Sequence, residues 1–118
     1  MAEVTFGSGC PTLKNDGALS ADAYRYGREL LGEGRIHTVA QLNRESGGGG
    51  ASGSAGSEDF AYVSQAVPSV MLALAAGQPE KGYVHPLHHP KVTFDPAALA
   101  PGTAVYAYTA LRWLEDHA

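Results

Sequence analysis

Apolar residues recur at helical spacing in three stretches of the chain, and each stretch is bounded by residues that favour helix ends. Residues 15–16 can cap the first helix, and Gly32 closes it. Ser57 is a suitable cap for the second helix, which Pro68 ends, and residues 95–96 combine a cap with a first-turn proline for the third. The predicted inward faces are, in chain order, Leu19, Ala23, Tyr26 and Leu30; Phe60, Val63 and Val67; and Tyr106, Ala110, Trp113 and Leu114.

Short segments rich in β-forming residues lie between these helices. Residues 3–6, 35–39 and 92–94 are short extended pieces, whereas residues 70–76 form the continuous apolar run VMLALAA. Such a run is typical of a central strand that is covered on both faces. Because helices and strands alternate along the chain, we predict an α/β fold in which helices pack on a small mixed sheet.

One segment carries no apolar pattern. Residues 46–57, SGGGGASGSAGS, contain only glycine, alanine and serine, so they bury too little apolar area to offset the entropy of ordering. Two interpretations stay open: a natural flexible surface loop, or an engineered or degenerate insert. In either case we expect a flexible stretch without a function of its own.

Length and composition limit the classes of protein to which the chain can belong. The 118 residues suit one domain, and 44% hydrophobic with 17% charged residues is typical of a globular protein. The net charge of −4 and the scattered Lys and Arg residues disfavour a nucleic-acid surface. No apolar run approaches the roughly twenty residues that span a bilayer. The first residues also lack a secretory pattern, so we expect a cytoplasmic protein without membrane contact.

Candidate chemistry is concentrated in a turn-rich loop that follows the predicted strand 70–76 and contains His85, His88 and His89. In α/β sheets, ligands collect at loops that leave the carboxyl ends of strands. Histidine is the commonest metal ligand among side chains and a proton carrier near neutral pH. Three loop histidines also fit a hydrogen-bonded surface, because a zinc site needs three or four protein ligands. The single cysteine, Cys10, excludes a thiolate-rich metal site and an internal disulfide.

Two carboxylates precede this loop along the chain. Glu58 and Asp59 lie in the first turn of the second predicted helix. An acidic pair at this place either compensates the helix dipole or takes part in catalysis, and the sequence leaves both interpretations open.

Three blocks of sequence resemble, in order, the C-terminal part of the zinc-dependent amidohydrolase/peptidase family, whose members include aminoacylase, hippurate hydrolase and the auxin-conjugate amidohydrolases. These blocks are NDGALSADAYRYGRELLG at 15–32, GSEDFAYVSQAVPSVMLALAAGQPEKG at 56–82 and PLHHPKVTFDPAALAPGTAVYAYTALRWL at 86–114. The resemblance implies that residues 1–14 are a remnant of the lid-domain strand and its return segment. Residues 15–118 would then be a partial catalytic domain, the C-terminal half of a zinc-peptidase fold.

The resemblance also implies roles for individual residues. In the family, the histidine of a Leu-His-x-Pro motif is a metal ligand, and this position is His88 here. The Gly-x-Glu-Asp-Phe motif lies beside the active site of the family, which makes Glu58 and Asp59 neighbours of the site, together with His85 and His89. The family's other metal ligands and its general base belong to an N-terminal half that this sequence does not contain.

Two functions follow as expectations. The first is a fragment of an amidohydrolase that uses two zinc or other divalent ions to cleave N-acyl-amino-acid or peptide amide bonds. With one dependable ligand and no base, it is expected to bind no metal tightly and to be inactive alone, so its status as an enzyme stays open. The alternative is a non-catalytic, stand-alone or engineered module that folds alone and binds a partner through the surface left by the absent half.

Overall fold

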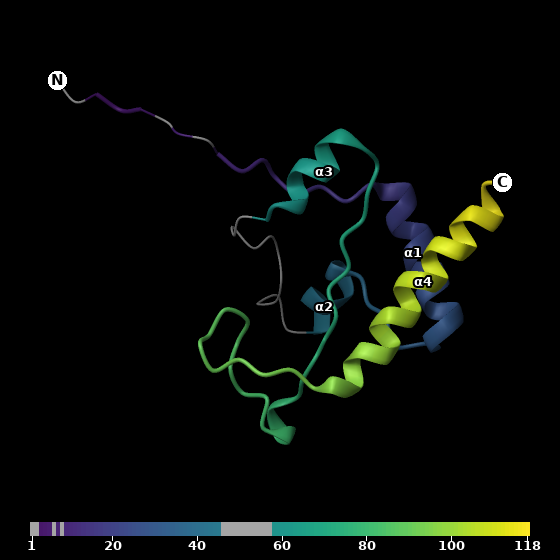
Figure 1. Ribbon diagram of the computed structural model, residues 1–118. Coiled ribbons are helices and arrows are strands. Elements are labelled where there is room, and N and C mark those ends of the chain that lie inside the picture. The colour runs from purple at the N-terminus through teal and green to yellow at the C-terminus, as the bar shows by residue number, and fades with distance from the viewer. Residues whose placement is uncertain (1–2, 6, 8, 46–57) are drawn as a thin grey trace. The chain divides into compact units, whose positions relative to one another are not determined.

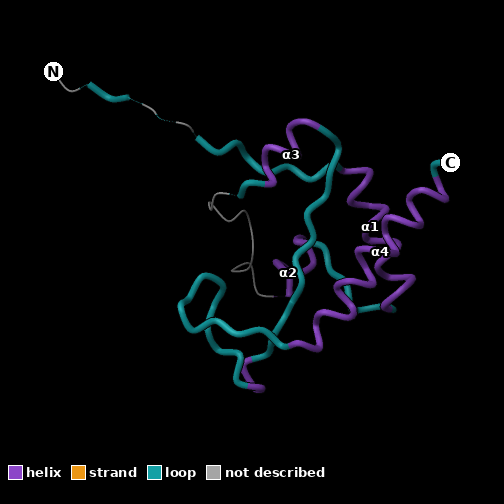
Figure 2. Tube along the Cα trace, viewed as in Figure 1, coloured by secondary structure: helices purple, strands orange, loops and turns teal. Residues whose placement is uncertain are grey.

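The computed structural model describes residues 3–5, 7, 9–45 and 58–118, and within them it is built of helices and loops (Figures 1 and 2). The predicted flexible stretch 46–57 lies outside the described residues. Two compact units are formed, one by Met1–Ala23 with His37–Met71 and one by Tyr24–Ile36 with Leu72–Ala118. The α-helices are α1 (Gly17–Leu31), α2 (Val39–Glu45), α3 (Phe60–Ala66) and α4 (Leu99–Asp116), and the 3-10 helices are η1 (Pro79–Lys81) and η2 (Pro96–Ala98).

The first predicted helix is confirmed as α1, with the cap that the sequence indicated. The Asp16 Oδ1 atom accepts a hydrogen bond from the Leu19 backbone N–H at 2.9 Å, which satisfies one of the free donors at the helix start. Of the predicted inward face, Ala23 and Tyr26 are fully buried, whereas Leu30 lies at the edge with 38% of its surface exposed. The helical spacing therefore identified the buried side of α1 correctly.

The strand predicted for residues 35–39 does not form: residues 35–38 belong to neither a helix nor a strand, and helix α2 begins at Val39. Thr38 precedes the helix, and its Oγ1 atom accepts from the Gln41 backbone N–H at 3.2 Å. The Gln41 side chain returns the interaction, because its Oε1 accepts from the Thr38 backbone N–H at 2.7 Å. This reciprocal arrangement is a capping box, and the Thr-x-x-Gln spacing that encodes it was present in the sequence.

The predicted α/β fold with a mixed sheet is wrong for the described part of the chain, where no strand forms. Residues 70–76 are extended, yet they pair with side chains and single backbone groups rather than with a strand. The Asn15 side-chain amide donates to the Met71 carbonyl at 3.0 Å and accepts from the Met71 N–H at 2.9 Å. The Asp16 N–H donates to the Ser69 carbonyl at 2.9 Å. A strand requires a neighbouring strand for its ladder. These contacts, and the Asp95 N–H that donates to the Ala76 carbonyl at 2.7 Å, satisfy only single groups of the segment.

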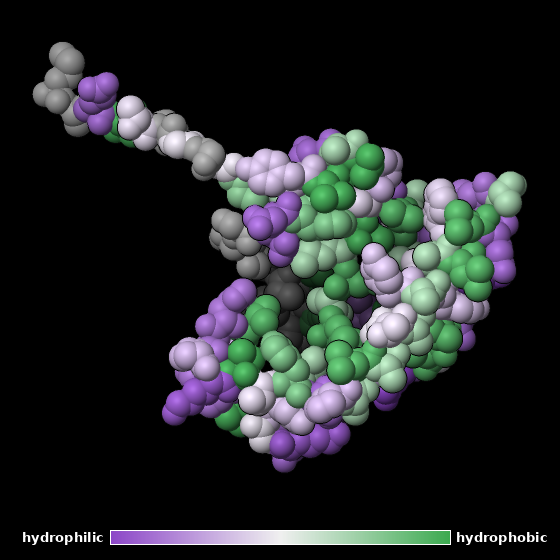
Figure 3. All heavy atoms as spheres, viewed as in Figure 1, coloured by the Kyte–Doolittle hydropathy of each residue, from purple (hydrophilic) through white to green (hydrophobic). Residues whose placement is uncertain are grey.

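The expected burial of this apolar run is also wrong. Met71, Leu72 and Leu74 expose 41%, 44% and 52% of their surface. Because neighbouring residues of an extended segment point to opposite faces, neither face of the segment is covered. Helix α3 shows the same pattern: Val63 and Val67, predicted to face inward, are exposed, and Ala61 is buried instead. Figure 3 shows apolar residues at the surface of the face in view. The side chains predicted as core therefore outnumber those that the described chain can bury.

Helix α4 lies beside the second half of α1 (Figure 1). Polar side chains join the two helices. Asp116 Oδ2 accepts hydrogen bonds from Arg25 Nη2 and from the Tyr26 hydroxyl, each at 2.8 Å. One turn and two turns earlier on α4, Arg112 pairs with Glu29 at 3.4 Å and the Tyr108 hydroxyl donates to the same carboxylate at 3.3 Å. The face of α4 that meets α1 thus contains residues spaced four apart.

The inward face predicted for the terminal helix is wrong for this reason. Tyr106, Trp113 and Leu114 expose 81%, 38% and 61% of their surface, and Ala110 is exposed as well. Helical spacing is shared by the apolar stripe and by the polar residues that meet α1, so spacing alone could not select between them. The polar side chains of α1 that pair with Tyr108, Arg112 and Asp116 determine which side of α4 packs against α1.

Hydrogen bonds from Arg25 and then Tyr26 hold the pKa of Asp116 below its ordinary value. Because the pKa is lower in the folded chain, this carboxylate stabilises the fold at pH values above its unfolded pKa, and the contribution is lost as pH falls through the folded pKa. We expect the difference in melting temperature between the chain and Asp116→Asn to be largest near neutral pH and to shrink between about pH 5 and pH 2. A melting-temperature difference that stays constant over this range would contradict the assignment.

No helix in the described residues combines the length and apolar character that crossing a membrane requires.

Candidate functional site

The histidine-rich segment is a loop closed at its neck by Asp95. The Asp95 backbone N–H donates to the Ala76 carbonyl at 2.7 Å, which joins the two ends of residues 77–94. The Asp95 side chain accepts from the Ala97 N–H at 2.9 Å, which confirms the predicted cap, and it pairs with Lys81 Nζ at 3.8 Å. One residue therefore closes the loop, starts η2 and anchors the 3-10 turn η1. The sequence suggested only the capping role.

Two glycines shape the first half of this loop. A Cβ atom at Gly77 would lie 2.6 Å from Tyr83 Cβ and 2.9 Å from Tyr83 Cγ, so only glycine allows this close approach. Gly82 ends η1 with a φ of 91°, a left-handed conformation that glycine adopts at little cost. The Tyr83 N–H then donates back to the Gln78 carbonyl at 3.3 Å. The pair of glycines around Pro-Glu-Lys was the sequence signal for this turn.

The second half of the loop is the histidine turn, defined here as residues 85–92. The His89 N–H donates to the Pro86 carbonyl at 3.1 Å, and the Val92 N–H donates to the His89 carbonyl at 2.9 Å. These bonds form two consecutive turns, over residues 86–89 and 89–92, and His88 is the third residue of the first turn. Among the residues that the structure describes, His88 is the sole residue other than glycine with a positive φ, at 70°.

The other two histidines of the turn stack on each other. The ring centroids of His85 and His89 are 4.3 Å apart, and the ring planes differ by 2°. The His89 Nδ1 atom also accepts a hydrogen bond from the Lys91 backbone N–H at 3.1 Å. The structure therefore brings two predicted neighbours of the site together, and it places His88 on the turn that they enclose, exposed to solvent.

The two predicted carboxylates belong to the start of α3, in the first unit. Glu58 Oε1 accepts from the Phe60 N–H at 3.1 Å, and the Glu58 carbonyl accepts from Cys10 Sγ at 3.3 Å. Asp59 occupies the N-cap position without a side-chain hydrogen bond to the helix. The expected cap, Ser57, lies outside the described residues. Glu58 thus supports the start of α3 directly, which is the helix-end interpretation of this acidic pair.

The described residues contain no group of three or more His, Cys, Asp or Glu side chains that could hold a metal ion. A tetrahedral zinc site takes at least three protein ligands. An exposed imidazole such as that of His88 is chemically suited to be one of them. This part of the chain can therefore supply one ligand to a divalent metal ion, but it does not form a complete metal site.

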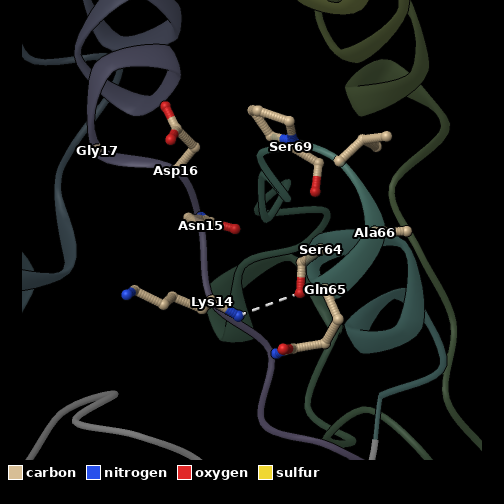
Figure 4. A pocket seen from close by; sticks show the side chains of 10 residues that line it. Lys14, Asn15, Asp16, Gly17, Ser64, Gln65, Ala66 and Ser69 are labelled. Atoms are coloured by element: carbon tan, nitrogen blue, oxygen red, sulfur yellow. Dashed lines mark hydrogen bonds between the residues drawn. The ribbon is translucent and has the colours of Figure 1, made fainter.

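A separate cavity of about 390 Å³ lies in the first unit, between the start of α1 and the end of α3 (Figure 4). Ser69 borders it with 9% of its surface exposed, and its hydroxyl has no hydrogen-bond partner among the described residues. The side chain of Asp16 already caps α1 at the same place. Sequence analysis did not identify this cavity, because its wall combines residues 14–17 with residues 64–69.

Comparison with known proteins identifies the family. The sequence profile of the peptidase family M20/M25/M40 matches residues 2–112, which is nearly the whole chain. The chain belongs to this family. Two blocks with no local resemblance to each other, the Gly-x-Glu-Asp-Phe motif at 56–60 and the histidine turn, lie within this one match. The family is generally metal-dependent, in agreement with the resemblance noted from the motifs.

Two curated relatives support this assignment. The chain is 29% identical over 114 residues to "Probable hydrolase sll0100" of Synechocystis sp. (strain ATCC 27184 / PCC 6803 / Kazusa), which is 97% of this chain and 26% of that protein. It is 38% identical over 106 residues to "IAA-amino acid hydrolase ILR1-like 6" of Arabidopsis thaliana, which is 90% of this chain and 20% of that protein. The chain therefore spans about a quarter or a fifth of these relatives. No solved structure matches it significantly.

Proposed function

We propose that this chain is part of a metal-dependent hydrolase that cleaves N-acyl-amino-acid or peptide-type amide bonds. The observation that carries the proposal is the family match over residues 2–112, which includes the turn that presents His88. Both relatives are named hydrolases, and the name of the plant relative specifies an amino-acid conjugate as its substrate. We include a cytoplasmic location in the proposal, as expected from the sequence.

In this proposal, His88 binds one of two divalent metal ions, zinc being the expected metal. The chemistry that a bound zinc ion supplies is polarisation of the amide carbonyl and activation of water. His85 and His89 shape the turn around His88 at the distances given above. Glu58 and Asp59 are proposed neighbours of the site, and Glu58 additionally stabilises the start of α3.

The remaining ligands and the general base are proposed to come from polypeptide outside this sequence. The described residues provide no complete metal-binding group, and the chain covers only 26% and 20% of its relatives. The exposed apolar residues at 72 and 74 and on α4 at 106 and 114 are where we expect that polypeptide to pack. The isolated chain should therefore bind metal weakly and show no hydrolysis.

A second candidate function is favoured by the same absence of a metal-binding group from the described residues. The chain would then be a non-catalytic module that folds alone and binds a partner through its exposed apolar residues. The division proposed from sequence, with 1–14 as a remnant of a lid segment and 15–118 as a partial catalytic domain, applies to both candidates. The two differ in whether His88 still contacts a metal ion when the family's other half is present.

A chimera separates the two candidates. The chain would replace the matching 106-residue region of the plant relative, and hydrolysis of an indole-3-acetyl amino acid would be followed with added zinc. We expect no hydrolysis by the isolated chain and zinc-dependent hydrolysis by the chimera, lost on chelation and restored by zinc. Circular dichroism and thermal melting establish that the chimera is folded. A folded chimera that lacks activity supports the non-catalytic module, whereas one that keeps its activity after chelation contradicts metal-dependent hydrolysis.

A further inference from the structure

His88 adopts a backbone conformation that an L-residue with a Cβ atom adopts at a cost. Its φ of 70° lies in the left-handed region, where glycine is the favoured residue. The same loop uses glycine for this conformation at Gly82, whose φ is 91°. Backbone stability alone would favour glycine at this position of the turn. The presence of a histidine therefore requires another explanation. Strained residues of this kind persist only where the surroundings over-determine their conformation.

The surroundings of His88 do constrain it from both sides. The hydrogen bond from His89 N–H to the Pro86 carbonyl, at 3.1 Å, closes the turn in which His88 lies. Pro86 and Pro90 each fix their own φ and restrict the residue before them, so the chain enters and leaves the turn in a defined direction. One backbone hydrogen bond thus joins the two ends of this turn, and a side-chain contact reinforces it.

The stacked rings join those ends. His85 precedes the turn and His89 completes it, and their ring centroids are 4.3 Å apart in nearly parallel planes. The His89 ring is itself held, because its Nδ1 accepts from the Lys91 N–H at 3.1 Å. His85 therefore packs on a ring that the backbone has already fixed. Separating the two rings would open the turn and release the left-handed conformation at His88.

We infer that His85 and His89 are positioning residues whose stacked rings hold the His88 backbone in its left-handed conformation and so fix where the His88 imidazole is presented. The role of that imidazole as a metal ligand rests on the proposed function, whereas the effect of the stack on the backbone can be measured independently. Neither His85 nor His89 needs to contact the metal ion. Their contribution is to pre-organise a ligand.

The test compares His85→Ala, which removes the stack, with His85→Phe, which keeps an aromatic ring, and with His37→Ala as a control outside the loop. Backbone NMR couplings in the isolated chain report the sign of φ at His88. We expect a positive φ in the unsubstituted chain, in His85→Phe and in His37→Ala, and its loss in His85→Ala. A positive φ that persists in His85→Ala overturns the inference, whatever the activity of the enzyme.

Zinc affinity of the chimera gives the second readout, measured by competition with a chelator of known affinity. We expect His85→Ala to weaken zinc binding by about 10–100-fold, the range for residues that orient a ligand, and His85→Phe to restore it to within about twofold. Equal weakening in His85→Ala and His85→Phe would show that stacking is not the cause. Should His88→Gly leave zinc binding unchanged, the proposed function fails while the backbone result stands on its own.

Discussion

Replacing Tyr26 with alanine should lower the free energy of unfolding by about 3–5 kcal/mol, as expected when a large aromatic side chain is removed from a core. Among the described residues, Tyr26 is the largest side chain with no exposed surface. Domains have only about 5–15 kcal/mol of stability, so this loss would be a large fraction of the total. Urea denaturation followed by Trp113 fluorescence would measure the loss.

Tyr106 provides a matched control for this prediction. It is the same residue type on α4 but exposes 81% of its surface, so Tyr106→Ala should change the free energy of unfolding by less than about 0.5 kcal/mol. Tyr26→Phe should fall between the two, because it keeps the buried ring and removes only the hydrogen bond to Asp116. If Tyr26→Ala and Tyr106→Ala are equally stable, the buried side of these helices has been misassigned.

Replacing His88 with glycine should reduce zinc-dependent hydrolysis by the chimera more than about 100-fold. Mutation of a residue that merely orients a metal ligand already lowers metal affinity or activity by about 10–100-fold, and His88 is proposed to be a ligand itself. Glycine is the sharpest substitution here, since it removes the imidazole while accepting a φ of 70° without strain. Stability should be unchanged or slightly higher, by up to about 1 kcal/mol. Initial rates at saturating zinc and a thermal melt of the same preparation measure the two effects.

Two further variants separate the ring from the backbone. His88→Asn keeps a residue type that tolerates the left-handed conformation but lacks an imidazole, so it should be as inactive as His88→Gly. His37→Ala removes a histidine outside the loop and should retain the activity of the unsubstituted chimera. Comparable rates for His88→Gly and His37→Ala would exclude His88 as a metal ligand.

The helices illustrate how far local sequence patterns reach. The cap at Asp16, the buried face of α1 and the cap at Asp95 were predicted because each depends on residues within four positions of one another. Helix α2 was missed although its capping box lies in the sequence, because the β-prone residues before it favoured a strand. These successes and this miss all concern short-range interactions.

The sheet was predicted wrongly because its stability is not local. Residues 70–76 have the composition of a buried strand, but a strand forms only when a neighbour supplies the other half of the ladder. In the described chain, the Asn15 amide takes that place at Met71 alone. The apolar stripe of α4 was misassigned for a similar reason, since residues on α1 decide which side of α4 packs.

The candidate site likewise has features that local sequence predicts and features that depend on distant residues. Motif spacing identified His88 and its neighbours but could not reveal that His85 stacks on His89 or that Asp95 closes the loop. Both depend on how the chain turns between positions that are not adjacent. The path of the loop requires the close approach to Tyr83 that Gly77 allows and the left-handed conformation that Gly82 adopts.

The sequence by itself determined the family, the caps at Asp16 and Asp95 and the histidine that is proposed to bind metal, because these are encoded by residue types at fixed short spacings. The tertiary structure alone decided which apolar faces are covered, which side of α4 meets α1 and how the histidine turn holds His88. Burial, strand pairing and ring stacking depend on partners that are distant in sequence, and no local pattern states whether such a partner is present.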